Sequence, residues 1–340
     1  MTVLVCRARL MTAALGVGLA DWPVPYSHDE RSAPVPPDIP TLATPSAITL
    51  GTSGLGQPDD AESEAAQVRA AVALLGSEHT LIDTSNAYGG GRSELILGKA
   101  IAEAGGVPAG KQIVSKADAE PGTGVFDRDR VMRSFEESIT RLGLDTLPLY
   151  QLHDPYTITF AEAMGTGGAV QGLVELREQG AIGAIGVAAG PTSMLTEFVR
   201  TGAFDVLLTH NRYTLVDRSA ADLISEAATA GMTVLNAAPY GGGLLAGGPR
   251  EGATYAYQAA PSALLAWLER LQQVCTAHGV PSAAAALAFS ARNPHIASTV
   301  VGVRSPQRLV ELDRLLATEV PAQIWSAIEA LGVPPSTIED

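Results

Sequence analysis

Residues 82–94 read Ile-Asp-Thr-Ser-Asn-Ala-Tyr-Gly-Gly-Gly-Arg-Ser-Glu. A short apolar run ends in Asp83, and Tyr88 follows five residues later, directly before three glycines and a helical pattern. An acid and a phenol after a strand and before a helix are typical of the C-terminal mouth of a parallel barrel, where barrel enzymes carry their functional residues. This stretch therefore predicts a strand, a functional loop and a helix, in that order.

From about residue 45 onward the chain repeats this alternation of short apolar runs and longer helical patterns. The repeat length of about 30 residues matches a strand with its crossover helix. The apolar and β-branched runs predict eight strands, at 48–50, 81–83, 113–115, 147–152, 184–187, 204–208, 233–235 and 298–301. The segments between them predict helices at 62–76, 93–104, 128–142, 168–179, 192–201, 218–230, 262–278 with 282–292, and 306–316.

Eight strand–helix units predict an α/β protein of the (β/α)8 TIM-barrel class. The alternative is a doubly wound dinucleotide-binding sheet, which needs a Gly-x-Gly-x-x-Gly turn after its first strand. Here the first strand leads into residues 51–56, Gly-Thr-Ser-Gly-Leu-Gly, in which the glycine spacing is different. We therefore expect one catalytic barrel over residues 45–335, followed by a short C-terminal tail at 336–340.

The composition excludes several classes of partner. The 340 residues include 22 Lys plus Arg and 36 Asp plus Glu, a formal net charge of −14, and an acidic protein repels phosphate backbones. No nucleic-acid partner is therefore expected. The sequence has no apolar run of about 18 residues, so no membrane partner is expected either. Cys6 and Cys275 lie far apart without metal-binding spacing, which predicts no metal site and a reducing, cytoplasmic location.

Residues 1–44 have a different character from the rest. Arg7 and Arg9 precede an apolar stretch at 10–20 that loosely resembles a signal peptide, but no clean small-x-small cleavage pattern follows it. Residues 23–44 are rich in Pro, Ser and charge, like a flexible linker. We interpret residues 1–44 as a flexible extension without a function of its own, or as an overlong start of the reading frame, and secretion is the alternative.

Two later strand ends supply an amine and an imidazole: Lys116 closes the run 112–116 and His153 closes the run 149–153. Taken singly, the acid suits a turn, the phenol a loop, the lysine a solvated strand end and the histidine a strand terminator. Their joint order at the ends of the second, third and fourth strands resembles the catalytic tetrad of the aldo-keto reductases. The four residues that match the tetrad are Asp83, Tyr88, Lys116 and His153.

The resemblance implies hydride transfer between a nicotinamide cofactor and a carbon of the substrate, with a proton moving to or from the substrate oxygen. A tyrosine with the ordinary pKa of about 10 is a poor base near neutrality, and a neighbouring ammonium lowers that pKa. We therefore expect Tyr88 to be the general acid and base, Lys116 to lower its pKa, and Asp83 to hold Lys116. His153 is expected to donate a hydrogen bond to the substrate oxygen.

The resemblance extends over about residues 45–335. Within it, residues 211–217 and 238–246 are similar to a branch that contains D-threo-aldose 1-dehydrogenases, L-fucose or L-galactose dehydrogenases and pyridoxal 4-dehydrogenases. These oxidise the anomeric hydroxyl of a cyclic sugar, or an equivalent hemiacetal, to a lactone with NAD. The implied substrate is thus a small molecule, a sugar or an aldehyde. A general aldehyde or ketone reductase using NADPH, and a redox-sensing protein like the channel β-subunits with little turnover, are the two alternatives.

Residues 302–311, after the last strand, predict a phosphate site. A Ser-Pro turn that opens a helix exposes N–H groups and the positive end of the helix dipole. By resemblance, Ser305 and the nearby backbone hold the adenosine-side phosphate, Arg308 lies against the adenine or a ribose phosphate, and Glu311 accepts from the adenine amine. The alternative is an ordinary helix start with a surface i,i+3 pair.

The choice between NAD and NADP depends on the same segment. Gly302 stands where a lysine that binds the 2′-phosphate of NADP is found in many aldo-keto reductases, so NAD is expected ahead of NADP. Arg304 or Arg308 could still serve that phosphate.

Three further strand ends depart from the aldo-keto reductase pattern. The chain has Ala188-Ala189 where many members carry Ser-Asn to hold the nicotinamide carboxamide. His210 stands where they carry Gln, and it is expected to contact the cofactor there. Ala237 replaces the tyrosine that stacks on the nicotinamide. We interpret these departures as a feature of the branch.

Overall fold

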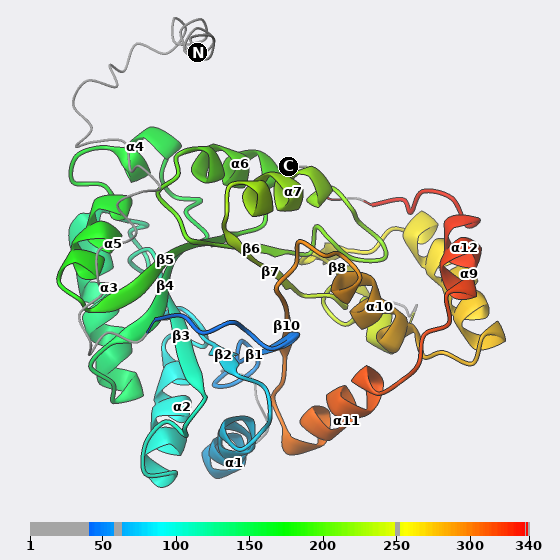
Figure 1. Ribbon diagram of the computed structural model, residues 1–340, viewed down its shortest axis with the longest axis horizontal. Coiled ribbons are helices and arrows are strands. Elements are labelled where there is room, and N and C mark those ends of the chain that lie inside the picture. Colours follow the sequence, from blue (N-terminus) through cyan, green and yellow to red (C-terminus); the bar gives the residue numbers. More distant parts are fainter. Residues whose placement is uncertain (1–40, 58–62, 249–251, 337, 339–340) are drawn as a thin grey trace, which may run out of the picture. The chain divides into compact units, whose positions relative to one another are not determined.

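The computed structural model describes residues 41–57, 63–248, 252–336 and 338, which contain a closed barrel of eight parallel strands (Figure 1). Around the barrel the strands neighbour one another in the order β1-β10-β7-β6-β5-β4-β3-β2. Their bounds are Ile48–Gly51 (β1), Leu81–Asp83 (β2), Gln112–Ala117 (β3), Leu147–His153 (β4), Ile182–Ala189 (β5), Val206–His210 (β6), Thr233–Ala237 (β7) and Ser298–Gly302 (β10). The (β/α)8 prediction is confirmed, and each predicted strand overlaps one of these eight.

The predicted extension at residues 1–44 lies outside the described residues except for 41–44, and the predicted tail at 336–340 lies outside them except for 336 and 338. These domain limits remain predictions.

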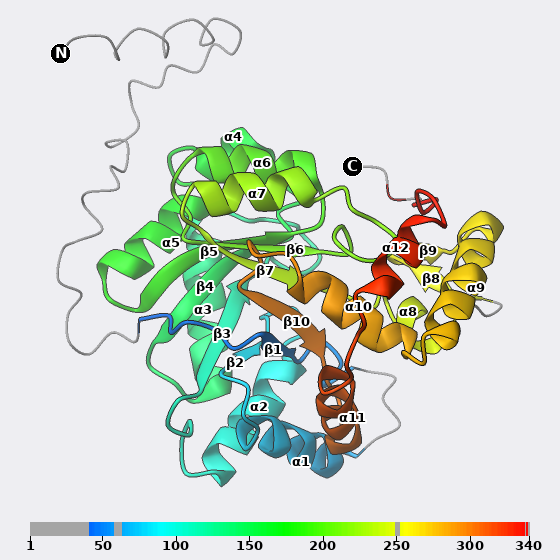
Figure 2. The same ribbon diagram turned by 45° about the vertical axis from the view of Figure 1, so that its right-hand side comes forward.

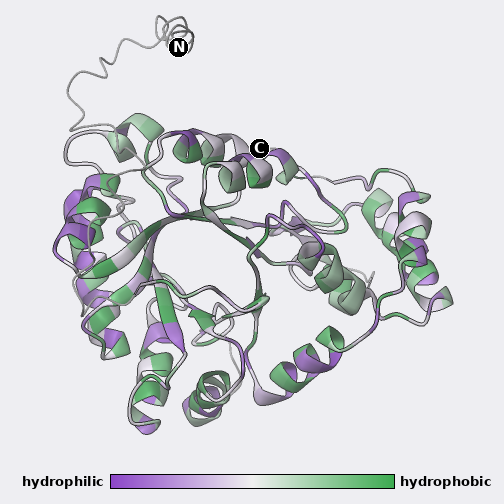
Figure 3. Ribbon diagram, in the orientation of Figure 1, coloured by the Kyte–Doolittle hydropathy of each residue, from purple (hydrophilic) through white to green (hydrophobic). Residues whose placement is uncertain are grey.

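The helices that cross between the strands also follow the prediction. Their bounds are Glu64–Leu75 (α1), Arg92–Glu103 (α2), Arg128–Leu142 (α3), Ala169–Glu178 (α5), Thr192–Arg200 (α6), Ala221–Thr229 (α7), Ser262–Ala277 (α9), Ser282–Ala291 (α10) and Pro306–Leu316 (α11). Helix α1 packs between α2 and α11 (Figure 2). Helices that mix hydrophobic and hydrophilic residues thus surround largely hydrophobic strands (Figure 3).

Several short elements were not predicted from the sequence. They are Phe160–Met164 (α4), Leu244–Gly247 (α8), Gln323–Glu329 (α12) and the antiparallel hairpin of Thr254–Tyr255 (β8) with Gln258–Ala259 (β9). Helix α4 did have a local signal, because Thr159 and Glu162 form a capping box at its start. The hairpin turn is built from Ala256 and Tyr257 at φ 46° and 69°, a conformation that sequence patterns assign to Asn or Gly.

Two hydrophobic clusters hold the barrel together. The larger lies between the strands and the helices, and the smaller joins alternate residues of neighbouring strands, among them Leu81, Val114 and Leu149. Side chains two apart on a strand share a face. The face that carries Leu81 and Val114 therefore also carries Asp83 and Lys116, and the face of Leu149 carries residues 151 and 153. This alternation turns the polar strand ends toward the inside of the barrel mouth.

Among the described residues, no single helix is both long and apolar enough to cross a membrane. The pair α9 and α10 meets that test only when the two are joined, and they are bent by 93° relative to each other.

Candidate active site

A lysine ammonium lies at the centre of the polar cluster in the barrel mouth. Lys116 Nζ, at the end of β3, donates to Asp83 Oδ2 at 2.6 Å and to the carbonyl oxygen of Thr84 at 2.8 Å. It also lies 3.2 Å from the hydroxyl of Tyr88. The Lys116 side chain is only 1% exposed and that of Asp83 only 3%, so the ion pair is shielded from water. Three of the four predicted catalytic side chains are therefore in direct contact.

The loop after β2 positions Tyr88 through glycines. Gly89, Gly90 and Gly91 all have positive φ, 61°, 66° and 86°, where glycine is favoured because it has no Cβ. At Gly89 the need is also steric, because a Cβ would lie 2.4 Å from the carbonyl oxygen of Gly56. The glycine turn thus lets the loops after β1 and β2 touch, while the chain reverses from Tyr88 into α2.

The pKa of Tyr88 is raised, whereas Lys116 was expected from the sequence to lower it. Burial raises the pKa of Tyr88, Lys116 lowers it, and the balance is a pKa raised to about 12. Lys116 thus acts on the phenol in the expected direction, but the loss of hydration outweighs it. The hydroxyl of Tyr88 is consequently protonated near neutrality and ready to donate.

Lys116 stays charged in spite of its burial. Desolvation lowers its pKa, but the charge of Asp83 and the contact with Tyr88 raise it further, and the net pKa lies above the ordinary lysine value. A permanent ammonium beside the phenol is what the stabilisation of a phenolate requires.

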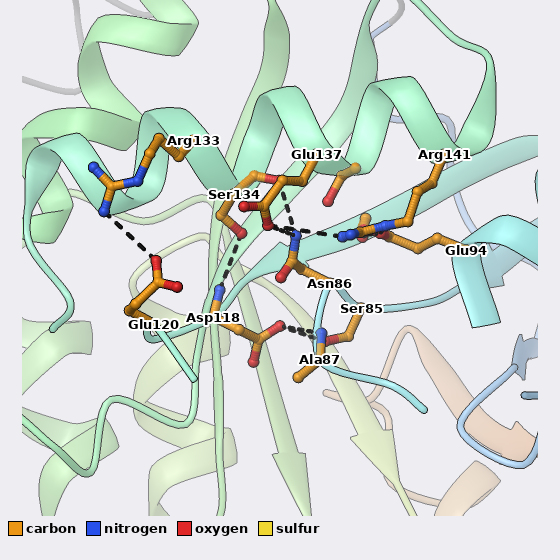
Figure 4. A network of polar contacts seen from close by, with 12 residues as sticks. Ser85, Asn86, Ala87, Glu94, Asp118, Glu120, Arg133, Ser134, Glu137 and Arg141 are labelled. Carbon is orange, nitrogen blue, oxygen red and sulfur yellow. Dashed lines mark hydrogen bonds and ion pairs between the residues drawn. The ribbon is translucent and has the colours of Figure 1, made fainter. Parts of the chain in front are cut away.

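His153, the fourth predicted residue, meets Tyr88 edge to face, with ring centroids 5.6 Å apart and an interplanar angle of 86°. Its Nδ1 lies 2.6 Å from Asp118 Oδ1 and 3.2 Å from Ser85 Oγ. Asp118 Oδ2 accepts from Ser85 Oγ at 2.5 Å and from the backbone N–H of Ala87 at 3.0 Å (Figure 4). The structure thus brings the imidazole to the phenol and ties it to a carboxylate behind it.

Asp118 is a site residue that was not predicted from the sequence. It stands two positions after Lys116, so strand alternation places it toward the same side, which is a usable signal. Its pairing with the histidine, however, joins residues 35 positions apart and could not be anticipated.

His210, predicted to contact the cofactor, lies beside the same cluster. Its Nε2 is 3.5 Å from Asp154 Oδ1, while Asp154 Oδ2 is 3.7 Å from His153 Nε2. Burial raises the pKa of Asp154, but the two imidazoles outweigh burial and lower that pKa to about 2. Asp154 also has φ 43°, a left-handed backbone that is uncommon outside glycine. A carboxylate therefore bridges the two histidines at the edge of the mouth.

A polar network on α3 supports the loop that carries Tyr88. Asn86 donates to the carbonyl oxygen of Ser134 at 3.1 Å and to Glu137 Oε2 at 2.9 Å, and it accepts from Arg130 at 3.1 Å. Figure 4 shows the Asn86 side chain below the helix that carries Ser134 and Glu137, with dashed lines toward both residues. Arg130 is 1% exposed and also donates to the backbone oxygen of Asp118. Residues Ser85 to Ala87 are thereby held on both sides.

The five residues predicted for the adenosine end lie at the junction of β10 and α11. Ser305 caps α11 by accepting from the N–H of Arg308, and Pro306 is the first residue of the helix. A Cβ built on Gly302 would meet nothing closer than Ser53 Oγ at 3.8 Å, so this strand end is open. Arg304 and Arg308 are exposed. This junction fits a nucleotide phosphate, because the strand end is open, the N-terminus of the eleven-residue helix α11 is next to it, and two guanidinium groups lie nearby.

Glu311 does not form the surface pair with Arg308 that was the alternative expectation, and its predicted contact with adenine stays a prediction. Its two carboxylate oxygens accept from Arg314 at 2.9 Å and 2.8 Å, so the i,i+3 pair of this helix is Glu311 with Arg314 and not Arg308 with Glu311. The positions of the alanines are as expected: Ala188 and Ala189 are buried at the end of β5, and Ala237 ends β7.

Comparison with known proteins gives relatives of moderate similarity. The chain is 31% identical to pyridoxal 4-dehydrogenase from Microbacterium luteolum over 220 residues, 62% of this chain and 64% of that protein. It is 32% identical to D-threo-aldose 1-dehydrogenase from a Pseudomonas species over 212 residues, with the same two coverages. It is 29% identical to L-galactose dehydrogenase from Arabidopsis thaliana over 302 residues, 87% of this chain and 89% of that protein. The matches thus span just under two thirds of the length of the first two relatives.

Solved structures share the barrel fold. The TM-score is 0.69 with a glycerol dehydrogenase from Gluconobacter oxydans, at 21% identity, covering 88% of this chain and 96% of that chain. It is 0.66 with an aldo-keto reductase from Bacillus halodurans, at 20% identity, covering 84% and 92%. The sequence profile of the Aldo/keto reductase family matches residues 47–332, which is most of the chain and the whole of the barrel. On that match, this chain belongs to the aldo/keto reductase family.

Proposed function

We propose that this protein is an NAD(P)-dependent oxidoreductase that transfers hydride between the nicotinamide and a carbonyl or hemiacetal carbon. The favoured reaction is oxidation of an aldose at C1 to the lactone. One observation carries the proposal: the Tyr88 hydroxyl lies 3.2 Å from the buried ammonium of Lys116, which is itself 2.6 Å from Asp83. The relatives named D-threo-aldose 1-dehydrogenase and L-galactose dehydrogenase support an aldose as the substrate class.

The four side chains have separate roles in this proposal. The bound cofactor supplies or accepts the hydride. Tyr88 donates a proton to the substrate oxygen during reduction and takes it back during oxidation, and Lys116 stabilises the phenolate between the two events. Asp83 keeps the ammonium in place. His153 borders the space in front of the phenol and donates a hydrogen bond to the substrate oxygen.

The junction of β10 and α11 is proposed to hold the adenosine side of the cofactor, with NAD preferred to NADP. The open position at Gly302 supports NAD, because no side chain there reaches toward a 2′-phosphate. His210 is proposed to contact the nicotinamide side, since it lies at the end of β6 beside the tetrad.

Arg308→Ala is expected to weaken NAD binding roughly tenfold, which is the loss of one charge-assisted hydrogen bond. Calorimetric titration with NAD measures it. Arg200→Ala is the matched control, because Arg200 is an exposed arginine on α6 that pairs with Glu226. An unchanged dissociation constant for Arg308→Ala would remove this arginine from the cofactor site. A greater loss for NADP than for NAD would assign it to the 2′-phosphate.

The activity is tested by incubating the protein with NAD and a panel of aldoses while following absorbance of the reduced cofactor. Turnover of an aldose to its lactone supports the proposal. Turnover of simple aldehydes with NADPH and of no sugar would favour the general reductase. Tight cofactor binding with negligible turnover of every substrate would favour the redox-sensing alternative.

The cytoplasm is the proposed compartment. Cys275 is a free, buried thiol, which suits a reducing environment. The proposed partner is a small-molecule substrate, a sugar or an aldehyde. We propose no nucleic-acid partner and no membrane partner.

A further inference from the structure

A carboxylate outside the predicted tetrad holds the imidazole of His153. Asp118 Oδ1 lies 2.6 Å from His153 Nδ1, and both side chains are only 10% exposed. The contact links the end of β4 to the residue directly after β3. A short, buried contact of this kind fixes both the rotation of the ring and the nitrogen that faces inward.

The other oxygen of Asp118 has its own donors, so the carboxylate cannot turn away. Oδ2 accepts from Ser85 Oγ at 2.5 Å and from the backbone N–H of Ala87 at 3.0 Å. A backbone N–H can only donate, so Oδ2 is an acceptor. The donors also lower the pKa of Asp118 in spite of its burial, with His153 as the largest favourable influence. An ionised carboxylate leaves Oδ1 as an acceptor too, and His153 Nδ1 must then carry a proton.

A proton on Nδ1 constrains what Nε2 can do. A neutral ring with Nδ1–H has a bare Nε2, which only accepts, whereas the imidazolium has N–H at both nitrogens. If His153 donates a hydrogen bond to the substrate oxygen, its ring must be charged. The charged and titratable groups that face it are Asp118, Asp154, Lys116 and Tyr88, and His210 lies beyond Asp154.

We propose that Asp118 is a positioning residue that keeps His153 as an imidazolium, so that its Nε2–H donates to the substrate oxygen beside the Tyr88 hydroxyl. The inference rests on the proposed function for the identity of the substrate oxygen. Two positive groups, the Lys116 ammonium and the His153 imidazolium, then flank the oxygens between which the proton moves. The pKa of His153 agrees: burial lowers it, the two aspartates raise it, and the net pKa lies above the ordinary value.

Asp118→Asn separates charge from hydrogen bonding. The N–H of Ala87 keeps the amide oxygen in the place of Oδ2, so the amide NH2 faces His153 Nδ1 and makes that nitrogen an acceptor. The ring becomes neutral, with its proton on Nε2. His153 thus keeps its Nε2–H donor and loses the positive charge of its ring. We expect kcat for carbonyl reduction at pH 7 to fall about 10- to 100-fold, less than the loss of a proton-transferring group itself, because the Nε2–H donor remains. The dissociation constant of the cofactor should be unchanged.

The pH dependence has a definite sign. A raised pKa means that the charge on His153 is present at low pH and is lost as pH rises through that pKa. Carbonyl reduction by the wild type should therefore decline on the alkaline side. In Asp118→Asn the larger of the two raising influences is gone and only Asp154 still opposes burial, so the decline should move to lower pH by about one unit or more. If Asp118 contributed only through packing, Asp118→Asn would lower the activity without moving the alkaline limb of the pH profile.

The state of His153 can also be read without any turnover. Nitrogen-15 NMR of the histidine rings, with the signals of residue 153 assigned by their absence in His153→Asn, reports the protons on each nitrogen. At pH 6.5, where an unperturbed histidine is half protonated, wild-type His153 should be mostly imidazolium and Asp118→Asn mostly neutral. This readout is independent of which substrate the enzyme takes, so an enzyme without sugar turnover but with a charged His153 would contradict only the proposed function.

Two further variants complete the test. Glu137→Gln removes a carboxylate that contacts Asn86 and Arg130 in the adjoining network but does not contact His153. It should leave the ring charged and the pH limb unmoved. Ser85→Ala keeps the carboxylate of Asp118 but removes the hydroxyl that holds this carboxylate in place and lies 3.2 Å from His153 Nδ1. The alkaline limb of the pH profile should therefore move in the same direction by less, and this variant serves if Asp118→Asn fails to fold. A neutral His153 in the wild type at pH 6.5, or an unmoved limb in both Asp118 and Ser85 variants, overturns the proposal.

Discussion

Tyr88→Phe is expected to lower kcat by about 1,000-fold or more while leaving cofactor affinity near the wild-type value. The substitution removes one oxygen from a buried ring, and with it the proton that the phenol exchanges with the substrate. The ring itself still packs edge to face against His153. Single-turnover measurement of reduced cofactor at saturating NAD and aldose separates this loss from binding.

Tyr213→Phe is the matched control for Tyr88→Phe, because Tyr213 is stacked on Phe289 with ring centroids 5.0 Å apart and lies outside the tetrad. It should keep near wild-type kcat. Full activity in Tyr88→Phe, with a melting temperature equal to that of the wild type, would show that another group carries the proton.

Lys116→Met is expected to reduce both stability and activity. The free energy of unfolding should fall by about 3–5 kcal/mol, because the buried carboxylate of Asp83 is left without its counter-charge. The activity should fall by about 100-fold or more, because the phenol loses the ammonium that favours its ionised form. Equilibrium unfolding in guanidinium chloride measures the first effect and steady-state kinetics the second.

The double variant Asp83→Asn with Lys116→Met tests the physical reason. Without the carboxylate there is no uncompensated charge, so the double variant should recover part of the stability lost by Lys116→Met and none of its activity. A double variant that is as unstable as the sum of the two single variants would mean that the pair contributes through packing and not through charge.

Much of the site was predictable because the physical signals are local. The apolar runs that end at Asp83, Lys116 and His153 lie on one barrel strand each, and alternation at every second residue turns all three side chains to the inner face. The three glycines after Tyr88 predicted a tight turn before a helix. Element order and strand alternation placed these strand ends at one mouth, and the resemblance to the aldo-keto reductases supplied the expectation that Tyr88 meets them.

Other features required the folded chain. The hairpin of β8 and β9 has alanine and tyrosine at positive φ, so no turn signal marked it. The alternative interpretation of the 302–311 segment paired Glu311 with Arg308, yet the Glu311 carboxylate accepts from Arg314, one turn along the same helix face. The hairpin and the Glu311 pair both depend on which residues the folded chain brings into contact, and tertiary packing decides that.

The sequence alone determined the barrel, the order of its strands and the residue types at each strand end, because periodicity and turn chemistry act between near neighbours in the chain. Only the tertiary structure decided the balance of charges in the mouth. Whether Lys116 or burial prevails at Tyr88, and whether a carboxylate such as Asp118 stands behind His153, depends on how much water the fold removes and which distant residues it brings together. Desolvation and long-range pairing have no local sequence pattern, since they exist only when the barrel has closed.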